Sequence, residues 1–135
     1  MTMKILIFLG FVQSMLGVKI KNDLTGKCYK ALVGESCALM TNGGCMIYTY
    51  RILNFKTDSV VVSYQVTAYC LPKEKENNYA HLNDNSTKTY KWTVNSDTIT
   101  ICGLDDYGKL TIQNSTLFGE DKWTKRKIEF SEELK

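Results

Sequence analysis

The chain has 135 residues, of which 44% are hydrophobic and 23% charged, and its formal net charge is +3. This composition indicates one folded domain with a real core and excludes a largely disordered chain. Lysine and glutamate are interspersed along the sequence rather than gathered in basic blocks. We therefore expect no nucleic-acid partner.

Residues 1–17 have the pattern of a secretory signal peptide. Lys4 supplies a short positive region, and residues 5–12 form a mostly apolar run followed by small and polar residues. Cleavage near Gly17 would leave residues 18–135 as a single domain. The run is too short to cross a bilayer as a helix, so no membrane span is predicted. The alternative is the first β-strand of a cytosolic protein.

The five cysteines also favour a secreted protein. They are Cys28, Cys37, Cys45, Cys70 and Cys102. No two of them form a C-x-x-C pair, which excludes a zinc ribbon or a thioredoxin-like motif. Two disulfides and one free thiol would suit an oxidising compartment. The pairing stays open, although a bridge from Cys37 to Cys45 would close a short loop. The free thiol leaves a monomer or a disulfide-linked dimer as the expected states.

Two Asn-x-Ser/Thr triplets begin at Asn85 and Asn114. Such triplets accept N-linked glycans in secreted eukaryotic proteins. We therefore expect a glycoprotein if the chain has a eukaryotic source.

Stretches rich in Val, Ile, Tyr and Thr recur between turn residues, as strands do. The first half of the chain is predicted to hold strands over 24–33, 45–55 and 60–70. Residues 34–44, which include three glycines, are predicted to form a loop. Residues 71–88 are polar and are predicted to form a solvated loop, with a short edge strand over 79–82.

The clearest hairpin lies between Tyr90 and Ile101. Tyr90, Trp92 and Val94 alternate with polar residues, and Ile99 and Ile101 do so after the turn at 95–97. Turns are expected at 103–108 and 119–121, and further strands at 109–113, 116–118 and 123–130. The polar tail 131–135 is expected to form a helical turn.

About eight short strands in hairpin order predict an all-β fold, an antiparallel up-and-down β-barrel. Closing the sheet removes the exposed edges that a flat sheet would present. A β-sandwich is the alternative. The Cys…Trp…Cys spacing of immunoglobulin domains is not found, because Trp92 lies only ten residues before Cys102.

The segment Gly26-Lys27-Cys28-Tyr29 resembles the Gly-x-Trp-Tyr opening of lipocalins and related calycins, with Cys28 in place of the tryptophan. The segments 53–62 and 90–101 are similar to strand-turn-strand units of small lipocalin-like proteins. The resemblance implies an eight-stranded barrel that holds a small apolar ligand or serves as a secreted inhibitor or binding scaffold. It also implies a basic residue near the final strand that packs at one barrel end, a position that Arg126 matches.

Aromatic and branched side chains supply candidates for a ligand cavity, since such cavities are largely apolar. The expected lining residues are Tyr48, Tyr50, Val62, Tyr64, Trp92 and Ile101. The alternative is a filled core, because a small eight-stranded barrel either packs solid or holds one small ligand.

Arg51 shares one face of its predicted strand with Ile47 and Leu53. If that face points inward, a buried guanidinium requires an anionic partner such as a ligand carboxylate. The opposite face, which holds Tyr48, Tyr50 and Ile52, is equally apolar. We therefore expect Arg51 on the surface.

We expect neither an enzyme nor a cofactor. His81 is the only histidine, lies among polar residues and has no nucleophile signature near it. The segments 83–85 and 105–106 carry oxygen ligands but lack the distal glutamate of a calcium loop, so we interpret them as turns. No phosphate-binding loop or zinc-protease motif is found in the sequence.

Two hypotheses for function follow. The first is a secreted lipocalin-like protein that holds a small apolar or amphipathic ligand in the barrel. The second is a secreted inhibitor or protein-interaction module with a filled core, which acts on a protein partner through residues 34–44 and 71–88.

Overall fold

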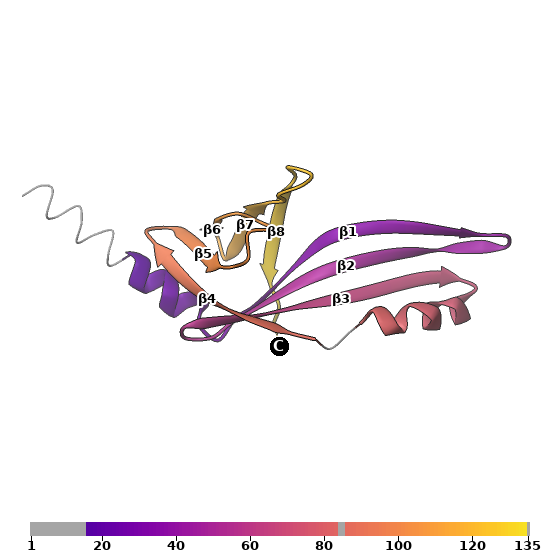
Figure 1. Cartoon of the computed structure of the whole chain (residues 1–135), viewed down its shortest axis with the longest axis horizontal. Coiled ribbons are helices and arrows are strands. Elements are labelled where there is room, and N and C mark those ends of the chain that lie inside the picture. Colours follow the sequence, from indigo (N-terminus) through magenta and orange to yellow (C-terminus); the bar gives the residue numbers. More distant parts are fainter. Residues whose placement is uncertain (1–15, 84–85, 135) are drawn as a thin grey trace, which may run out of the picture.

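The computed structural model describes residues 16–83 and 86–134, and within them eight antiparallel strands close into a barrel in chain order. This confirms the predicted fold class, and it is compatible with a lipocalin-like fold (Figure 1). The strands are β1 (Cys28–Met40), β2 (Gly43–Phe55), β3 (Ser59–Leu71), β4 (Lys88–Asn95), β5 (Thr98–Cys102), β6 (Leu110–Gln113), β7 (Thr116–Glu120) and β8 (Lys127–Glu132).

Three strands are much longer than the rest and extend beyond the barrel. β1, β2 and β3 have 13 residues each, whereas β4 pairs with β3 only over Ser59–Val62 and β8 pairs with β1 only at Tyr29 and Lys30. Beyond the barrel, β1 and β2 (residues 32–50) and β3 (residues 65–71) form a three-stranded sheet that projects away from it (Figure 1). We call this sheet the arm.

The barrel interior is filled by large side chains from alternate positions of the strands. Phe55 and Trp92 meet edge to face with ring centroids 4.9 Å apart, and Tyr29 meets Phe55 in the same way at 5.7 Å. Trp92 Nε1 donates a hydrogen bond to the Lys56 carbonyl oxygen at 3.0 Å. The indole therefore packs in the core and also has its polar atom satisfied, as a buried tryptophan requires.

A short helix over residues 16–24 lies against one end of the barrel. Ile20 and Leu24 are buried in the core cluster, and Lys21 Nζ lies 5.7 Å from the Trp92 ring centroid. The predicted strand over 24–33 is therefore wrong at its start, since the strand begins at Cys28. Residues 1–15, which hold most of the predicted signal peptide, lie outside the described residues, as does Asn85.

The predicted loop over 34–44 is wrong, because β1 and β2 continue through it to a tight turn at 41–42. Pairing runs out to Met40 opposite Gly43, and the register shifts only between Leu32 and Gly34. Glycines mark loops in a sequence, but here one lies beside this irregularity and two lie at the start of β2.

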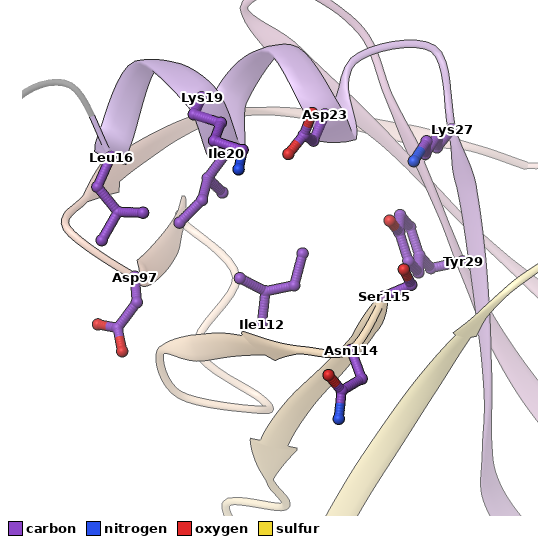
Figure 2. Close-up of a pocket in the computed structure, with 10 residues that line it drawn as sticks. All are labelled: Leu16, Lys19, Ile20, Asp23, Lys27, Tyr29, Asp97, Ile112, Asn114 and Ser115. Atoms are coloured by element: carbon purple, nitrogen blue, oxygen red, sulfur yellow. The ribbon is translucent and has the colours of Figure 1, made fainter.

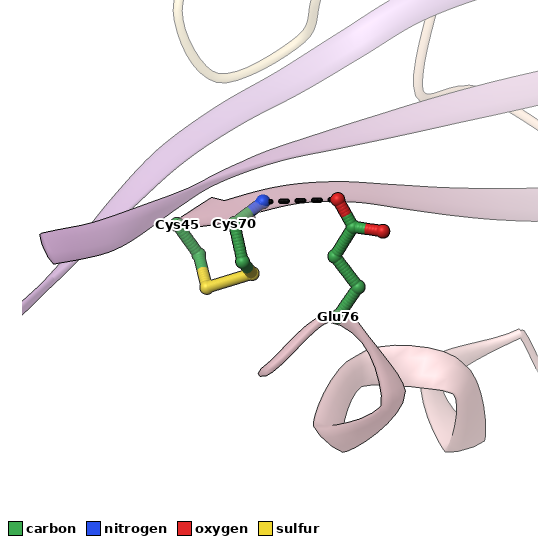
Figure 3. Close-up of a disulfide and its surroundings, with 3 residues drawn as sticks. All are labelled: Cys45, Cys70 and Glu76. Atoms are coloured by element: carbon green, nitrogen blue, oxygen red, sulfur yellow. Dashed lines mark hydrogen bonds between the residues drawn. A yellow bond between two sulfur atoms is a disulfide. The ribbon is translucent and has the colours of Figure 1, made fainter. Parts of the chain in front are cut away.

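The disulfide joins Cys45 to Cys70 rather than to Cys37 (Figure 3). Cys45 on β2 lies directly opposite Cys70 on β3. Cys37 on β1 lies opposite Met46 on β2 instead. This is the one disulfide within the described residues, where two were expected. Cys37 and Cys102 are exposed, free thiols.

Residues 73–82 form the 3-10 helix η1 (Lys73–Leu82), where a solvated loop with a short strand was predicted. The helix follows the outer edge of β3. Glu76 Oε1 accepts a hydrogen bond from the Cys70 backbone N–H at 3.1 Å (Figure 3), and the Asn83 side chain bonds both the N–H and the carbonyl oxygen of Val66. These side chains satisfy edge groups that a neighbouring strand would otherwise bond.

The C-terminal strands also differ from the prediction in their limits. Gly119 and Glu120 belong to β7, and the turn comes later, where the Asp121 carboxylate accepts hydrogen bonds from the Trp123 and Thr124 N–H groups at 2.8 Å. β8 then continues to Glu132, so the first residues of the expected helical tail are strand. β8 meets β1 here and completes the barrel.

The two tryptophans of the chain make a matched test of the filled core. Trp92 is 2% exposed and Trp123 is 80% exposed. Trp92→Ala should lower the free energy of unfolding by about 3–5 kcal/mol, because it removes a large buried ring and leaves a cavity. Trp123→Ala should change it by no more than about 0.5 kcal/mol. Urea unfolding followed by circular dichroism measures both, and equal effects would contradict a packed interior around Trp92.

Candidate functional site

Arg51 is the one buried charged residue within the described part of the chain, with 6% of its surface exposed. The expectation that it lies on the surface is wrong. Along β2 it alternates in step with Leu53 and Phe55, whose side chains point into the barrel. Arg51 therefore lies where the barrel core ends and the arm begins.

Three side chains from two other parts of the fold hold the guanidinium. Nε donates to the Tyr107 hydroxyl at 2.9 Å, and Nη2 donates to Asp106 Oδ2 at 3.1 Å and to the Tyr64 hydroxyl. The Arg51 Cζ atom also lies 3.6 Å from the centroid of the Tyr64 ring. The burial of this guanidinium is compensated by one carboxylate and two aromatic hydroxyls.

The local fold places each of these partners. Tyr64 lies directly opposite Arg51 in the pairing of β2 with β3. Asp106 and Tyr107 lie on the turn between β5 and β6, which is fixed by hydrogen bonds from Lys122 N to the Asp106 carbonyl and from Glu120 N to the Tyr107 carbonyl. Burial raises the pKa of Tyr107, while the nearby Arg51 charge opposes that shift.

Two cavities meet beside this cluster. One, of about 250 Å³, opens at the barrel mouth and is lined by Arg51, Val62, Tyr64, Ser86, Lys88, Tyr90, Gly103, Leu104 and Asp106. The other, of about 400 Å³, runs along the arm and is lined by Ser36, Ile47, Thr49, Tyr64, Val66, Leu82 and Ser86. Because Tyr64 and Ser86 line both, the two adjoin. We call them together the groove.

The six predicted lining residues fall into three groups. Val62, Trp92 and Ile101 are buried in the core, and Val62 also reaches the groove. Tyr64 lies between the two cavities of the groove. Tyr48 and Tyr50 lie on the opposite face of β2 from Arg51, where Tyr48 meets Tyr69 and Tyr50 meets Lys30. The structure therefore does not bring the six together around one cavity.

A larger cavity of about 490 Å³ lies between the helix over 16–24 and the strands beside it (Figure 2). Its lining combines Ile20, Tyr29 and Ile112 with exposed side chains such as Lys19, Asp23 and Asp97. Among the described lining residues Tyr29 is the one buried residue with a polar side-chain group, and the charged side chains around it are open to solvent. The Arg51 groove is therefore the stronger candidate.

Other predicted features are less distinctive. His81 is exposed on η1, and Arg126 is exposed in the turn before β8. In the described residues, no three His, Cys, Asp or Glu side chains are placed to hold a metal ion. No helix in the same part of the chain is long and apolar enough to cross a membrane. Searches of protein-family models, curated proteins and solved structures find no match to this chain.

The sequence pointed to Tyr64 as a lining residue and to Arg51 as a possible buried cation, but it did not join them to Asp106 and Tyr107, which are far away in the chain. Asp106 and Tyr107 follow Arg51 by 55 and 56 residues. They were predicted only as part of a turn. The sequence feature that pointed to the site was Arg51 in an otherwise apolar strand. Because both faces of that strand are apolar, the sequence did not show which face is buried.

The buried Tyr29 gives the fold a pH dependence that can be measured. Burial, with smaller contributions from Glu132 and Asp23, raises the pKa of Tyr29 from 10.0 to about 12. Between these values the unfolded chain has lost a proton that the folded chain keeps, so rising pH favours unfolding. This contribution is fully present below pH 10 and is lost towards pH 12.

Urea unfolding of wild type and Tyr29→Phe at pH 8 to 12 tests this dependence. The wild type should lose stability relative to Tyr29→Phe as the pH rises above 10. Tyr69→Phe, at an exposed tyrosine, is the control and should follow the wild type. Parallel profiles for all three proteins would contradict the raised pKa.

Proposed function

We propose that this chain is a lipocalin-like binding protein that holds a small amphipathic molecule with an anionic head group in the groove. The observation that carries the proposal is the buried Arg51 at the inner end of an open, partly apolar groove. A desolvated guanidinium binds carboxylate, sulfate or phosphate oxygens more strongly than an exposed one.

The charges around the groove favour an anion. Arg51 and Lys88 contribute two positive charges to the cavity at the barrel mouth, and Asp106 contributes one negative charge. Asp106 is accessible to solvent, because 41% of its side chain is exposed. Among the described lining residues one net positive charge therefore remains, and an anionic head group would lie on the side of Arg51 and Lys88.

The rest of the groove suits an apolar chain. Ile47, Val66 and Leu82 supply apolar surface, and the short side chains of Ser36 and Thr49 leave space above the sheet. Pockets for small molecules commonly join such a surface to a few fixed polar groups. The filled barrel directs the ligand to this open end rather than to the space around Trp92.

The resemblance to lipocalins supports the same class of function, since barrels of that family hold a small apolar ligand. The Cys45–Cys70 disulfide is in keeping with an oxidising compartment and so with secretion.

A second candidate function is a protein-interaction module. The end of the arm exposes apolar side chains, with Leu39 at 87% and Leu71 at 75% exposed. These residues belong to the segments 34–44 and 71–88 on which this hypothesis rests. A large exposed apolar patch is typical of a binding surface.

Titration with 11-(dansylamino)undecanoic acid tests the groove, because this probe joins an apolar chain to a carboxylate. Wild type should bind it saturably, with a rise in dansyl fluorescence. Thr49→Trp, which fills the groove, should weaken binding about tenfold or more. The matched control Thr67→Trp lies on the opposite face of the sheet and should bind as the wild type does.

The neutral analogue 11-(dansylamino)undecan-1-ol tests the role of charge. It should bind about tenfold more weakly than the acid, since it cannot form a charge-assisted hydrogen bond to Arg51. No saturable binding, or equal weakening by Thr49→Trp and Thr67→Trp, would overturn the proposed site. Equal affinity for the acid and the alcohol would overturn the anionic head group.

A further inference from the structure

The two outer edges of the arm differ. The edge of β3 is covered by η1 and is bonded by Glu76 and Asn83. Along the edge of β1, pairing with β8 ends at Lys30. Within the described residues, β1 from Ala31 to Met40 therefore has a strand neighbour on one side only.

The register identifies which backbone groups this edge presents. The Phe55 N–H donates to the Lys27 carbonyl oxygen, so the backbone groups of Phe55 point towards β1. Backbone groups alternate in direction along a strand, so every second residue of β2 from Phe55 back to Cys45 also points its N–H and carbonyl groups towards β1. Cys45 pairs with Ala38, which in turn faces β2. The N–H and carbonyl groups of Glu35, Cys37 and Leu39 therefore face the open edge.

This edge lacks most of the features that prevent strand pairing. Edges are usually protected by prolines, charges, bulges or a covering element. Between Ala31 and Met40 there is no proline, Glu35 is the only charged residue, and the single irregularity lies next to the barrel at Leu32–Gly34. Glu35–Met40 is regular strand with the exposed Leu39 in it.

We propose that β1 pairs antiparallel with β1 of a second copy of this chain, about a two-fold axis at Cys37. A two-fold axis turns a strand antiparallel to itself, so one edge meets its own copy. In this register Glu35 lies opposite Leu39 of the second copy, and the two Glu35 carboxylates do not face each other. Like charges directly opposite on paired strands would be destabilising.

A cleft beside the edge fits the same arrangement. It has a volume of about 320 Å³ and lies between residues 32–35 of β1 and the turn before β8, where Asp121, Thr124 and Arg126 line it. The register that joins Cys37 to Cys37 places Thr41 and Asn42 of the second copy near Val33 and Leu32. The polar end of one arm would thus enter the polar cleft of the other copy.

The exposed Cys37 thiol makes the register testable. In the proposed dimer the two Cys37 Cα atoms form a hydrogen-bonded pair about 5.5 Å apart. A disulfide spans that distance. Copper–phenanthroline then accepts two electrons, the two thiols lose two protons, and one S–S bond forms between the copies.

The first experiment is oxidation of the full chain followed by non-reducing electrophoresis. The wild type and Cys102→Ser should form a covalent dimer, and Cys37→Ser should not. Dimers that persist in Cys37→Ser or that require Cys102 would overturn the register.

The second experiment needs no thiol. Sedimentation equilibrium of Cys37→Ser, which keeps the Cys45–Cys70 disulfide, should show a dimer at about 100 µM or below. Leu39→Pro, which removes an edge N–H, should weaken it about tenfold or more, while Leu39→Ala keeps the N–H and the dimer. A monomer at all these concentrations, as expected if the edge binds a different extended peptide, would overturn the proposal. So would a dimer unaffected by Leu39→Pro.

Discussion

The buried guanidinium of Arg51 is the interaction on which the arrangement of this molecule depends. It connects β2 to β3 through Tyr64 and to the β5–β6 turn through Asp106 and Tyr107. A charge this deeply buried is tolerated only when its hydrogen bonds are made, so the turn and the arm must meet at this point. Tyr107 also packs edge to face on Phe130, which extends the contact to β8.

Arg51 also divides the molecule into two regions with different properties. On one side, short strands enclose a core filled by Trp92, Phe55 and Tyr29. On the other side, the same three long strands form an open sheet with a groove on one face, a free edge on β1 and a covered edge on β3. Barrels of this size have little interior space beyond their own side chains. The proposed binding therefore depends on the open sheet rather than on the barrel interior.

The sequence predicted the positions of the central strands well, but it predicted their buried faces only where alternation was one-sided. The hairpin from Tyr90 to Ile101 appears as β4 and β5, and the predicted strands over 45–55 and 60–70 lie within β2 and β3. Prediction was wrong at Arg51, because β2 is apolar on both faces and alternation alone does not choose between them. It was also wrong at 34–44, where glycines next to a bulge and at a hairpin end resembled those of a loop.

The disulfide and the site depended on information that local patterns do not carry. Cys45 and Cys70 come together through strand register, which follows from the hairpin turn rather than from the spacing of cysteines. Asp106 and Tyr107 lie beside Arg51 because of the topology of the closed barrel, not because of their positions in the sequence. Local signals therefore identified the elements and the barrel, but long-range pairing determined the groove.

The most direct test of this account is side-chain NMR of the protein titrated with 11-(dansylamino)undecanoic acid. The Arg51 Nε–H signal and the amide signals of Thr49 and Val66 should shift as the probe binds. The Trp92 Nε1–H signal should stay unchanged, because the indole lies in a filled core. A shift of the Trp92 signal with no change at Arg51 would contradict the account, as would no change at any of these groups.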